Sequence, residues 1–139
     1  MEERHPTGIL DTSTFIKLKR VTDESVLPHE PLITAVTLAE LSIGPLIAAS
    51  DDERAIRQAH LQEAEADFDP VPFDADAARA FARVATSLRA AGRKPTARSF
   101  DALIAATALA HQIPVFTCNA RDFEGIDELR VIAVPVDDS

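Results

Sequence analysis

The chain has 139 residues, of which 46% are hydrophobic and 27% are charged, with a formal net charge of −9 at pH 7. This composition excludes a disordered chain and a general nucleic-acid binder. The sequence has no signal-peptide pattern, and no apolar run approaches the roughly 18 residues that a membrane helix needs. Its single cysteine, Cys118, excludes a disulfide framework and fits a reducing compartment, so we expect a cytoplasmic protein.

The N-terminal half of the chain predicts two short strands and three helices. In chain order we expect a strand at 8–10, a helix at 14–20, a strand at 32–34, and helices at 37–49 and 51–66. Thr37 and Ser50 are typical first residues for the last two helices, because their hydroxyls can accept a hydrogen bond from a free backbone N–H. Two prolines within residues 70–73 predict an extended connector.

The C-terminal half predicts two more helices followed by two more strands. We expect a helix at 75–91 between Asp74 and Gly92, a helix at 100–111 after Ser99, and strands at 114–118 and 129–134. Strands that alternate with helices predict an α/β fold with a mostly parallel sheet covered on both faces. We expect a single domain over residues 1–139, with a flexible N-terminus at 1–6 and a C-terminal tail at 135–139.

Several polar side chains fall where such a sheet binds ligands, at the carboxyl ends of its strands. Asp11 ends the first strand, and Asn119 and Asp122 follow the third. Glu40 and Asp101 lie in the predicted first turns of two helices that begin near the same edge. We therefore expect carboxylates to converge at this edge of the sheet.

Each of these residues also has a simpler structural interpretation. Thr37 and Glu40 match a capping box, in which Glu40 only satisfies a backbone N–H. Asp11, Asp101 and Asp122 can each cap a helix or a turn. However, Asp101 begins a helix that is apolar nearly all round, and a carboxylate in that place needs a partner. Converging carboxylates repel one another, and a hard divalent cation such as Mg²⁺ would relieve the repulsion.

Four segments resemble the motifs of PIN-domain ribonucleases, and the size and sequence resemble the VapC-type toxins of bacterial toxin–antitoxin pairs. The segments read GILDTS at 8–13, TLAEL at 37–41, FDALIAATA at 100–108 and TCNARDF at 117–123. Together they cover the chain from residue 8 to about residue 134, in the order of the family. The resemblance implies a PIN-like three-layer α/β/α sandwich and a metal-dependent endoribonuclease that cuts RNA such as tRNA or rRNA.

The resemblance also implies the site residues and the partners. It implies a Mg²⁺ or Mn²⁺ ion held by Asp11, Glu40 and Asp101. The fourth acidic position of the family falls on Asn119 or Asp122, and the sequence leaves both open. The side chains expected to support these ligands are Thr12, Ser13, Thr117 and Asn119. The family further implies a homodimer and a cognate VapB-type antitoxin that inserts a basic side chain among the carboxylates.

Basic side chains gather between residues 77 and 100, a stretch that contains no acid. They are Arg79, Arg83, Arg89, Arg93, Lys94 and Arg98. We interpret this basic strip as a candidate RNA-binding surface, because cations on an otherwise acidic protein can still receive phosphates locally. The alternative is an ordinary solvated helix face.

Other classes of protein fit the sequence less well. A phosphoacceptor receiver domain needs an acidic pair early and a late lysine, but Asp11 has no adjacent acid and no lysine follows Lys94. A haloacid-dehalogenase-type phosphatase needs Asp-x-Asp, and Ser13 stands at the second position. The remaining alternative is a catalytically inactive PIN-type scaffold, which would bind metal without cleaving RNA.

Overall fold

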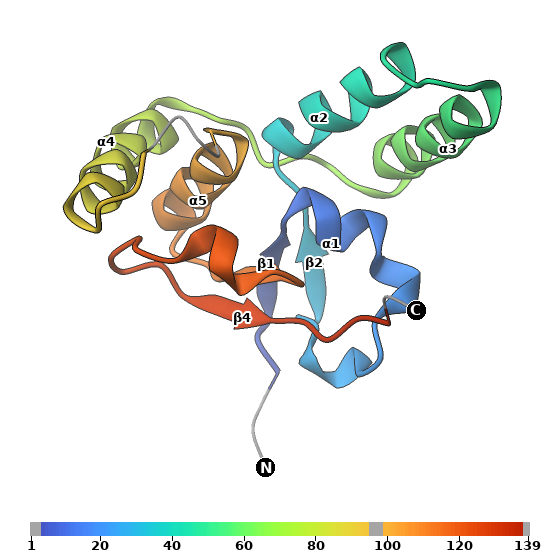
Figure 1. Ribbon diagram of the computed structural model, residues 1–139. Helices are drawn as coiled ribbons and strands as arrows, with labels where there is room; N and C mark the ends of the chain where they lie inside the picture. The colour runs from blue at the N-terminus through green and yellow to red at the C-terminus, as the bar shows by residue number, and fades with distance from the viewer. Residues whose placement is uncertain (1–3, 95–98, 138–139) are drawn as a thin grey trace.

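A four-stranded parallel sheet forms the centre of the molecule (Figure 1). The structure is a computed structural model and describes residues 4–94 and 99–137. The strands are β1 (Thr7–Leu10), β2 (Glu30–Leu32), β3 (Val115–Thr117) and β4 (Val131–Ala133), in the spatial order β2-β1-β3-β4. All three pairings are parallel, so the carboxyl ends of the strands lie at one edge, and the predicted fold class is confirmed.

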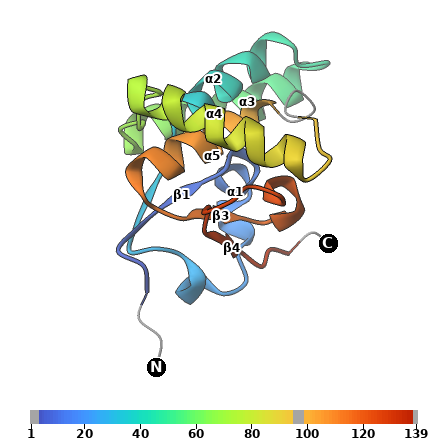
Figure 2. The same ribbon diagram turned by 90° about the vertical axis from the view of Figure 1, so that its left-hand side faces the viewer.

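Five α-helices flank this sheet in the described ranges. They are α1 (Thr12–Ile16), α2 (Ala35–Leu46), α3 (Asp51–Asp67), α4 (Ala75–Ala90) and α5 (Ser99–His111), and the short 3-10 helices are η1 (Leu18–Arg20), η2 (Glu24–Val26) and η4 (Ala120–Phe123). Figure 2 shows α4 and α5 together over one face of the sheet. The other face is covered by η1, η2 and the C-terminal segment, so one of the three layers is built from short turns.

The two central strands bury apolar side chains on both faces. Ile9 and Val115 pack in the layer of α4 and α5, whereas Leu10 and Phe116 pack in the opposite layer. Gly8 leaves room for the Phe116 ring, because a Cβ at this position would overlap it. Burial on both faces explains why these strands read as continuous apolar runs rather than as an alternating pattern.

The start of α2 differs from the prediction, and the difference matters for the site. Thr34, not Thr37, caps the helix, since its Oγ1 accepts a hydrogen bond from Thr37 N at 3.1 Å. The predicted capping box is therefore wrong, because Glu40 lies in the second turn of α2 and is not needed at its N-terminus. The predicted starts of α3 and α4 are confirmed, with Ser50 and Asp74 accepting from Glu53 N and Ala77 N.

The connector between α3 and α4 and the two chain ends attach to the sheet region. Val71 N donates to Ile33 O at 2.9 Å, and Ala35 N donates to Val71 O at 2.8 Å. At the ends, Glu30 N donates to Pro6 O and Asp137 N donates to Arg20 O. Residues 1–3 and 138–139 of the predicted terminal segments lie outside the described residues. In the part of the chain that the structure describes, no helix has the length and apolar character needed to cross a membrane.

Candidate active site

Asp11 follows β1 directly and lies at the carboxyl edge of the sheet with only 2% of its surface exposed. It caps α1, because its Oδ1 accepts from Thr14 N at 3.2 Å and from the Thr14 hydroxyl. Its Oδ2 accepts from Thr117 Oγ1 at 2.8 Å and from Ser13 Oγ at 3.4 Å. Both oxygens are thus held by neighbouring donors, and the carboxylate has a fixed orientation.

Two fully buried threonines from different segments hold Asp11. The Thr14 hydroxyl accepts from Cys118 N at 2.8 Å while it donates to Asp11. The Thr117 hydroxyl accepts from Asn119 N at 3.0 Å while it donates to Asp11. Thr117 was predicted from the sequence as a supporting residue, whereas Thr14 was not. The signal for Thr14 was its place three residues after a capping aspartate.

Glu40 reaches the same region from the second turn of α2. Thr12, the first residue of α1, donates from its Oγ1 to Glu40 Oε1 at 2.6 Å. The negative charge of Asp11 acts on Glu40, so the two carboxylates are near enough to repel one another. The structure therefore brings together these two predicted site residues and the predicted supporting residues Thr12, Ser13 and Thr117.

The two carboxylates, Asp11 and Glu40, form an anionic centre at this edge of the sheet. Burial raises the pKa of Asp11, and hydrogen bonds from Thr14 and Thr117 oppose this rise only in part. Burial also raises the pKa of Glu40, and the charge of Asp11 adds to the rise. Within residues 4–94 and 99–137, no lysine, arginine or histidine forms an ion pair with either side chain.

Asp101 lies half-buried in the first turn of α5. Its neighbour Phe100 lines a pocket of about 340 Å³ together with Thr12 and Glu40, so the start of α5 faces the anionic centre. Among the described residues, however, no three Asp, Glu, His or Cys side chains are grouped closely enough to hold a metal ion. Asp11, Glu40 and Asp101 therefore do not form a closed ligand set in this structure.

The fourth candidate position lies in η4, which follows β3. Asn119 Nδ2 donates to Asp122 Oδ1 at 3.2 Å, so the two alternatives left open by the sequence contact each other. Asn119 also donates its backbone N–H to Thr117, which in turn donates to Asp11. The turn is thereby connected to the anionic centre through Thr117.

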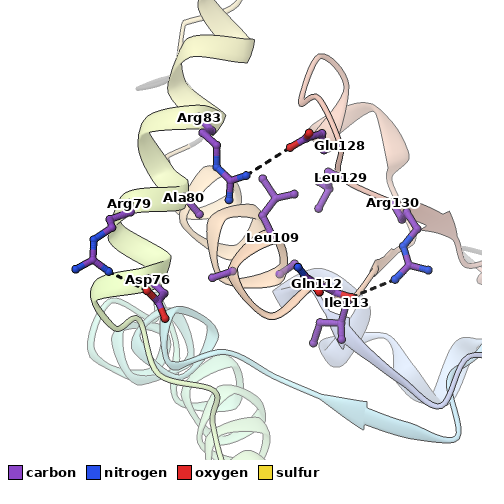
Figure 3. A pocket seen from close by; sticks show the side chains of 12 residues that line it. Asp76, Arg79, Ala80, Arg83, Leu109, Gln112, Ile113, Glu128, Leu129 and Arg130 are labelled. Carbon is purple, nitrogen blue, oxygen red and sulfur yellow. Dashed lines mark hydrogen bonds and ion pairs between the residues drawn. The ribbon is translucent and has the colours of Figure 1, made fainter.

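The structure divides the predicted basic strip. Arg79 and Arg83 lie beside a pocket of about 980 Å³ whose other walls include Gln112 and Glu128, at the end of α5 and just before β4. Figure 3 shows Arg79 directed at Asp76 and Arg83 at Glu128, with N–O distances of 2.8 and 3.4 Å. This pocket lies toward the amino ends of β3 and β4, away from Asp11.

The other cations of the strip lie near the end of α4. The Arg93 guanidinium donates to the carbonyls of Arg121 at 3.1 Å and Glu124 at 2.5 Å, and so ties this end to η4. Arg89 and Lys94 are exposed in the same neighbourhood. Arg98 lies outside the described residues. Among the described residues of the strip, Arg89 and Lys94 are thus the exposed cations at this end of α4.

An apolar groove adjoins the anionic centre. We use the name for the 340 Å³ pocket, which is lined by Thr12, Ile16, Glu40, Leu41, Ile43, Gly44, Ile47, Arg57, His60 and Phe100. Ile43, Ile47 and Phe100 expose 41%, 69% and 42% of their surfaces. Clustered exposed apolar side chains of this kind mark contact surfaces in folded proteins.

The raised pKa of Glu40 gives a first prediction. The folded chain takes up the Glu40 proton at a higher pH than the unfolded chain. At neutral pH the ionised carboxyl therefore lowers the free energy of unfolding. This loss disappears as the pH falls through the raised pKa of the folded chain. In EDTA, Glu40→Gln should raise the melting temperature by a few degrees at pH 7.5, and the gain should shrink toward pH 4.5. Glu65→Gln, an exposed change on α3, controls for net charge. A gain independent of pH would contradict the electrostatic origin.

The comparisons with known proteins agree with this geometry. A family model described as PIN domain matches residues 9–129. Ribonuclease VapC5 from Mycobacterium tuberculosis is 44% identical over 86% of this chain and 87% of its own length. Ribonuclease VapC from Rickettsia bellii is 30% identical over 94% of this chain and 98% of its own length.

A solved structure matches over nearly the whole chain. The crystal structure of VapBC-5, a member of the VapBC family of toxin–antitoxin systems from Mycobacterium tuberculosis, aligns with a TM-score of 0.81 at 40% identity, covering 93% of this chain and 99% of that one. The sequence motifs and the parallel sheet fit this match. The chain therefore belongs to the PIN-domain family and, within it, to the VapC ribonucleases.

Proposed function

We propose that this protein is a metal-dependent endoribonuclease toxin that cleaves tRNA or rRNA. The observation that carries the proposal is a pair of carboxylates, buried Asp11 and half-buried Glu40, at the carboxyl edge of a parallel sheet. Both have a raised pKa, and neither has a basic partner among the described residues. These oxygen donors fit a hard divalent cation, Mg²⁺ or Mn²⁺, because such an ion would neutralise their mutual repulsion. The relatives named above as ribonucleases support the same reaction.

Asp11, Glu40 and Asp101 would hold the ion, with Asp122 as the fourth acidic residue. Once bound, a divalent cation supplies a water of lowered pKa and offsets the charge that develops on a phosphate. The chain contributes preorganisation, since Thr14 fixes Asp11 and leaves its carboxylate no need to reorient during the reaction.

The direct test of the proposal is cleavage of a total tRNA and rRNA pool by purified protein in Mg²⁺, Mn²⁺ or EDTA. We expect discrete cuts that disappear in EDTA and in Asp101→Ala. A folded protein that binds metal but cuts none of these RNAs would support the inactive-scaffold alternative. Cuts that persist in Asp101→Ala would come from a contaminating nuclease and would contradict the assigned site.

We place the RNA path at the end of α4 rather than along the whole basic strip. Arg89 and Lys94 are exposed there, whereas Arg79 and Arg83 are paired with acids on the far side of α5. Replacing Arg89 and Lys94 together with Ala should weaken RNA binding about tenfold at low salt and reduce the slope of log K against log salt by roughly 1.4 to 1.8 units, since each phosphate contact contributes about 0.7 to 0.9. The Arg79→Ala/Arg83→Ala pair removes the same charge and should change neither quantity. Equal effects of the two pairs would contradict this placement.

The apolar groove is the surface that we assign to a cognate VapB-type antitoxin. An apolar segment laid along Ile43 and Ile47 would bring a basic side chain within reach of Glu40, whose carboxylate is in no ion pair with a described residue. The similar VapBC-5 structure belongs to a toxin–antitoxin family, which supports this kind of partner.

We also propose a homodimer and a cytoplasmic location, both carried over from the VapC-type resemblance. Cys118 is unpaired, which fits a reducing compartment. Sedimentation equilibrium of the purified protein tests the dimer, and a single species at 15.0 kDa would contradict it.

A further inference from the structure

Thr37 lies behind Glu40 and is connected to it through Thr12. It lies in the first turn of α2, three residues before Glu40, so both side chains lie on the same side of the helix. The Thr37 Oγ1 is 2.9 Å from Thr12 Oγ1, and the Thr12 Oγ1 is 2.6 Å from Glu40 Oε1. Thr37 is fully buried, so its hydroxyl has no access to bulk water.

The direction of these hydrogen bonds follows from counting hydrogens. The Thr12 hydroxyl has one hydrogen, and it donates this hydrogen to Glu40. The Thr37 hydroxyl must therefore be the donor in its contact with Thr12. Two hydroxyls in a row thus point toward the ionised carboxylate, and each bond polarises the next.

Thr37 departs from the usual behaviour of a hydroxyl in a helix. Such hydroxyls commonly donate to the carbonyl four residues earlier. In this protein Ser42, Thr86 and Thr107 do so, at 2.7, 2.8 and 3.0 Å. For Thr37 the corresponding residue is Ile33, which precedes the helix and its N-cap Thr34, and the Ile33 carbonyl accepts from Val71 N. The Thr37 hydroxyl instead lies 2.9 Å from Thr12 Oγ1.

We propose that Thr37 is a positioning residue of the carboxylate site. Its hydroxyl orients Thr12 so that Thr12 donates to Glu40, and this holds Glu40 in place for a divalent cation. The inference rests on the proposed function, because it assigns a role in preparing the metal ligand. Thr37 itself touches neither the ion nor the RNA in this role.

The test compares three substitutions by Mn²⁺ titration, with electron paramagnetic resonance as the readout. Thr37→Val keeps the shape but removes the hydroxyl and should weaken Mn²⁺ binding about tenfold or more, the usual effect of losing a residue that supports a metal ligand. Thr37→Ser restores the hydroxyl and should bind Mn²⁺ within about twofold of the wild type. Thr107→Val removes an equally buried hydroxyl that bonds only within α5, and should leave the affinity unchanged.

Crystal structures of the wild type and Thr37→Val separate this inference from the proposed function. We expect the Thr12–Glu40 hydrogen bond to be lost or rearranged in the variant, with or without metal. An intact bond in Thr37→Val, or wild-type Mn²⁺ affinity in that variant, would overturn the role of Thr37. If the wild type itself binds no Mn²⁺, the proposed metal site fails, and the crystal structures still decide whether Thr37 positions Glu40. Thr37→Ala serves the same comparison if Thr37→Val does not fold.

Discussion

An Asp11→Asn variant is expected to lose RNA cleavage by about 10³-fold or more while remaining folded. The substitution removes the charge that would hold a divalent cation at the centre of the site, and a single lost electrostatic group in a preorganised site has an effect of this order. The fold should persist, because the Asn oxygen can still accept from Thr14 N and cap α1. The measurement is single-turnover cleavage of tRNA at saturating Mn²⁺.

Thermal unfolding with Mn²⁺ provides the control for this variant. A ligand at 100 times its Kd stabilises a folded protein by about 2.7 kcal/mol, so Mn²⁺ should raise the melting temperature of the wild type. The melting temperature of Asp11→Asn should not respond to the ion. A variant that cleaves RNA at the wild-type rate, or that retains the full Mn²⁺ response, would show that Asp11 is not a metal ligand.

An Ile47→Asp variant is expected to bind the cognate antitoxin at least about 100-fold more weakly while keeping its RNA cleavage. Ile47 lines the apolar groove and is 69% exposed, so the change should have little effect on the fold. In the complex, however, the substitution removes apolar burial and places an unpaired carboxylate in the contact. A loss of roughly 3 kcal/mol in binding free energy corresponds to about 100-fold in Kd. The measurement is the antitoxin concentration that halves the cleavage rate.

Ile56→Asp is the matched control for the groove. Ile56 lies on α3, is 60% exposed and does not line the groove, so this variant should remain fully inhibited by the antitoxin. If Ile47→Asp is inhibited as strongly as the wild type, the antitoxin binds elsewhere. If both variants escape inhibition, the contact extends over α3 and the groove alone does not define it.

The local signals in the sequence predicted most of the elements. Ser50 and Asp74 cap α3 and α4 as expected, because an N-cap needs only a short polar side chain three residues before a free N–H. The apolar character of α5 correctly predicted a helix packed between other elements. The start of α2 was mispredicted because Thr34 and Thr37 carry the same capping chemistry, and only the structure shows that Thr34 accepts from Thr37 N while the Thr37 hydroxyl contacts Thr12.

The sequence by itself determined the fold class, the order of the elements and the positions of Asp11 and Glu40 at the carboxyl edge, because periodicity, capping and strand ends are local properties of the chain. Only the tertiary structure decided what each side chain contacts. It revealed Thr14 and Thr37 as supports of the two carboxylates, and it assigned the Arg93 guanidinium to backbone carbonyls near residue 121. These partners come from segments that are distant in sequence or from competing local bonds, so no spacing rule predicts them.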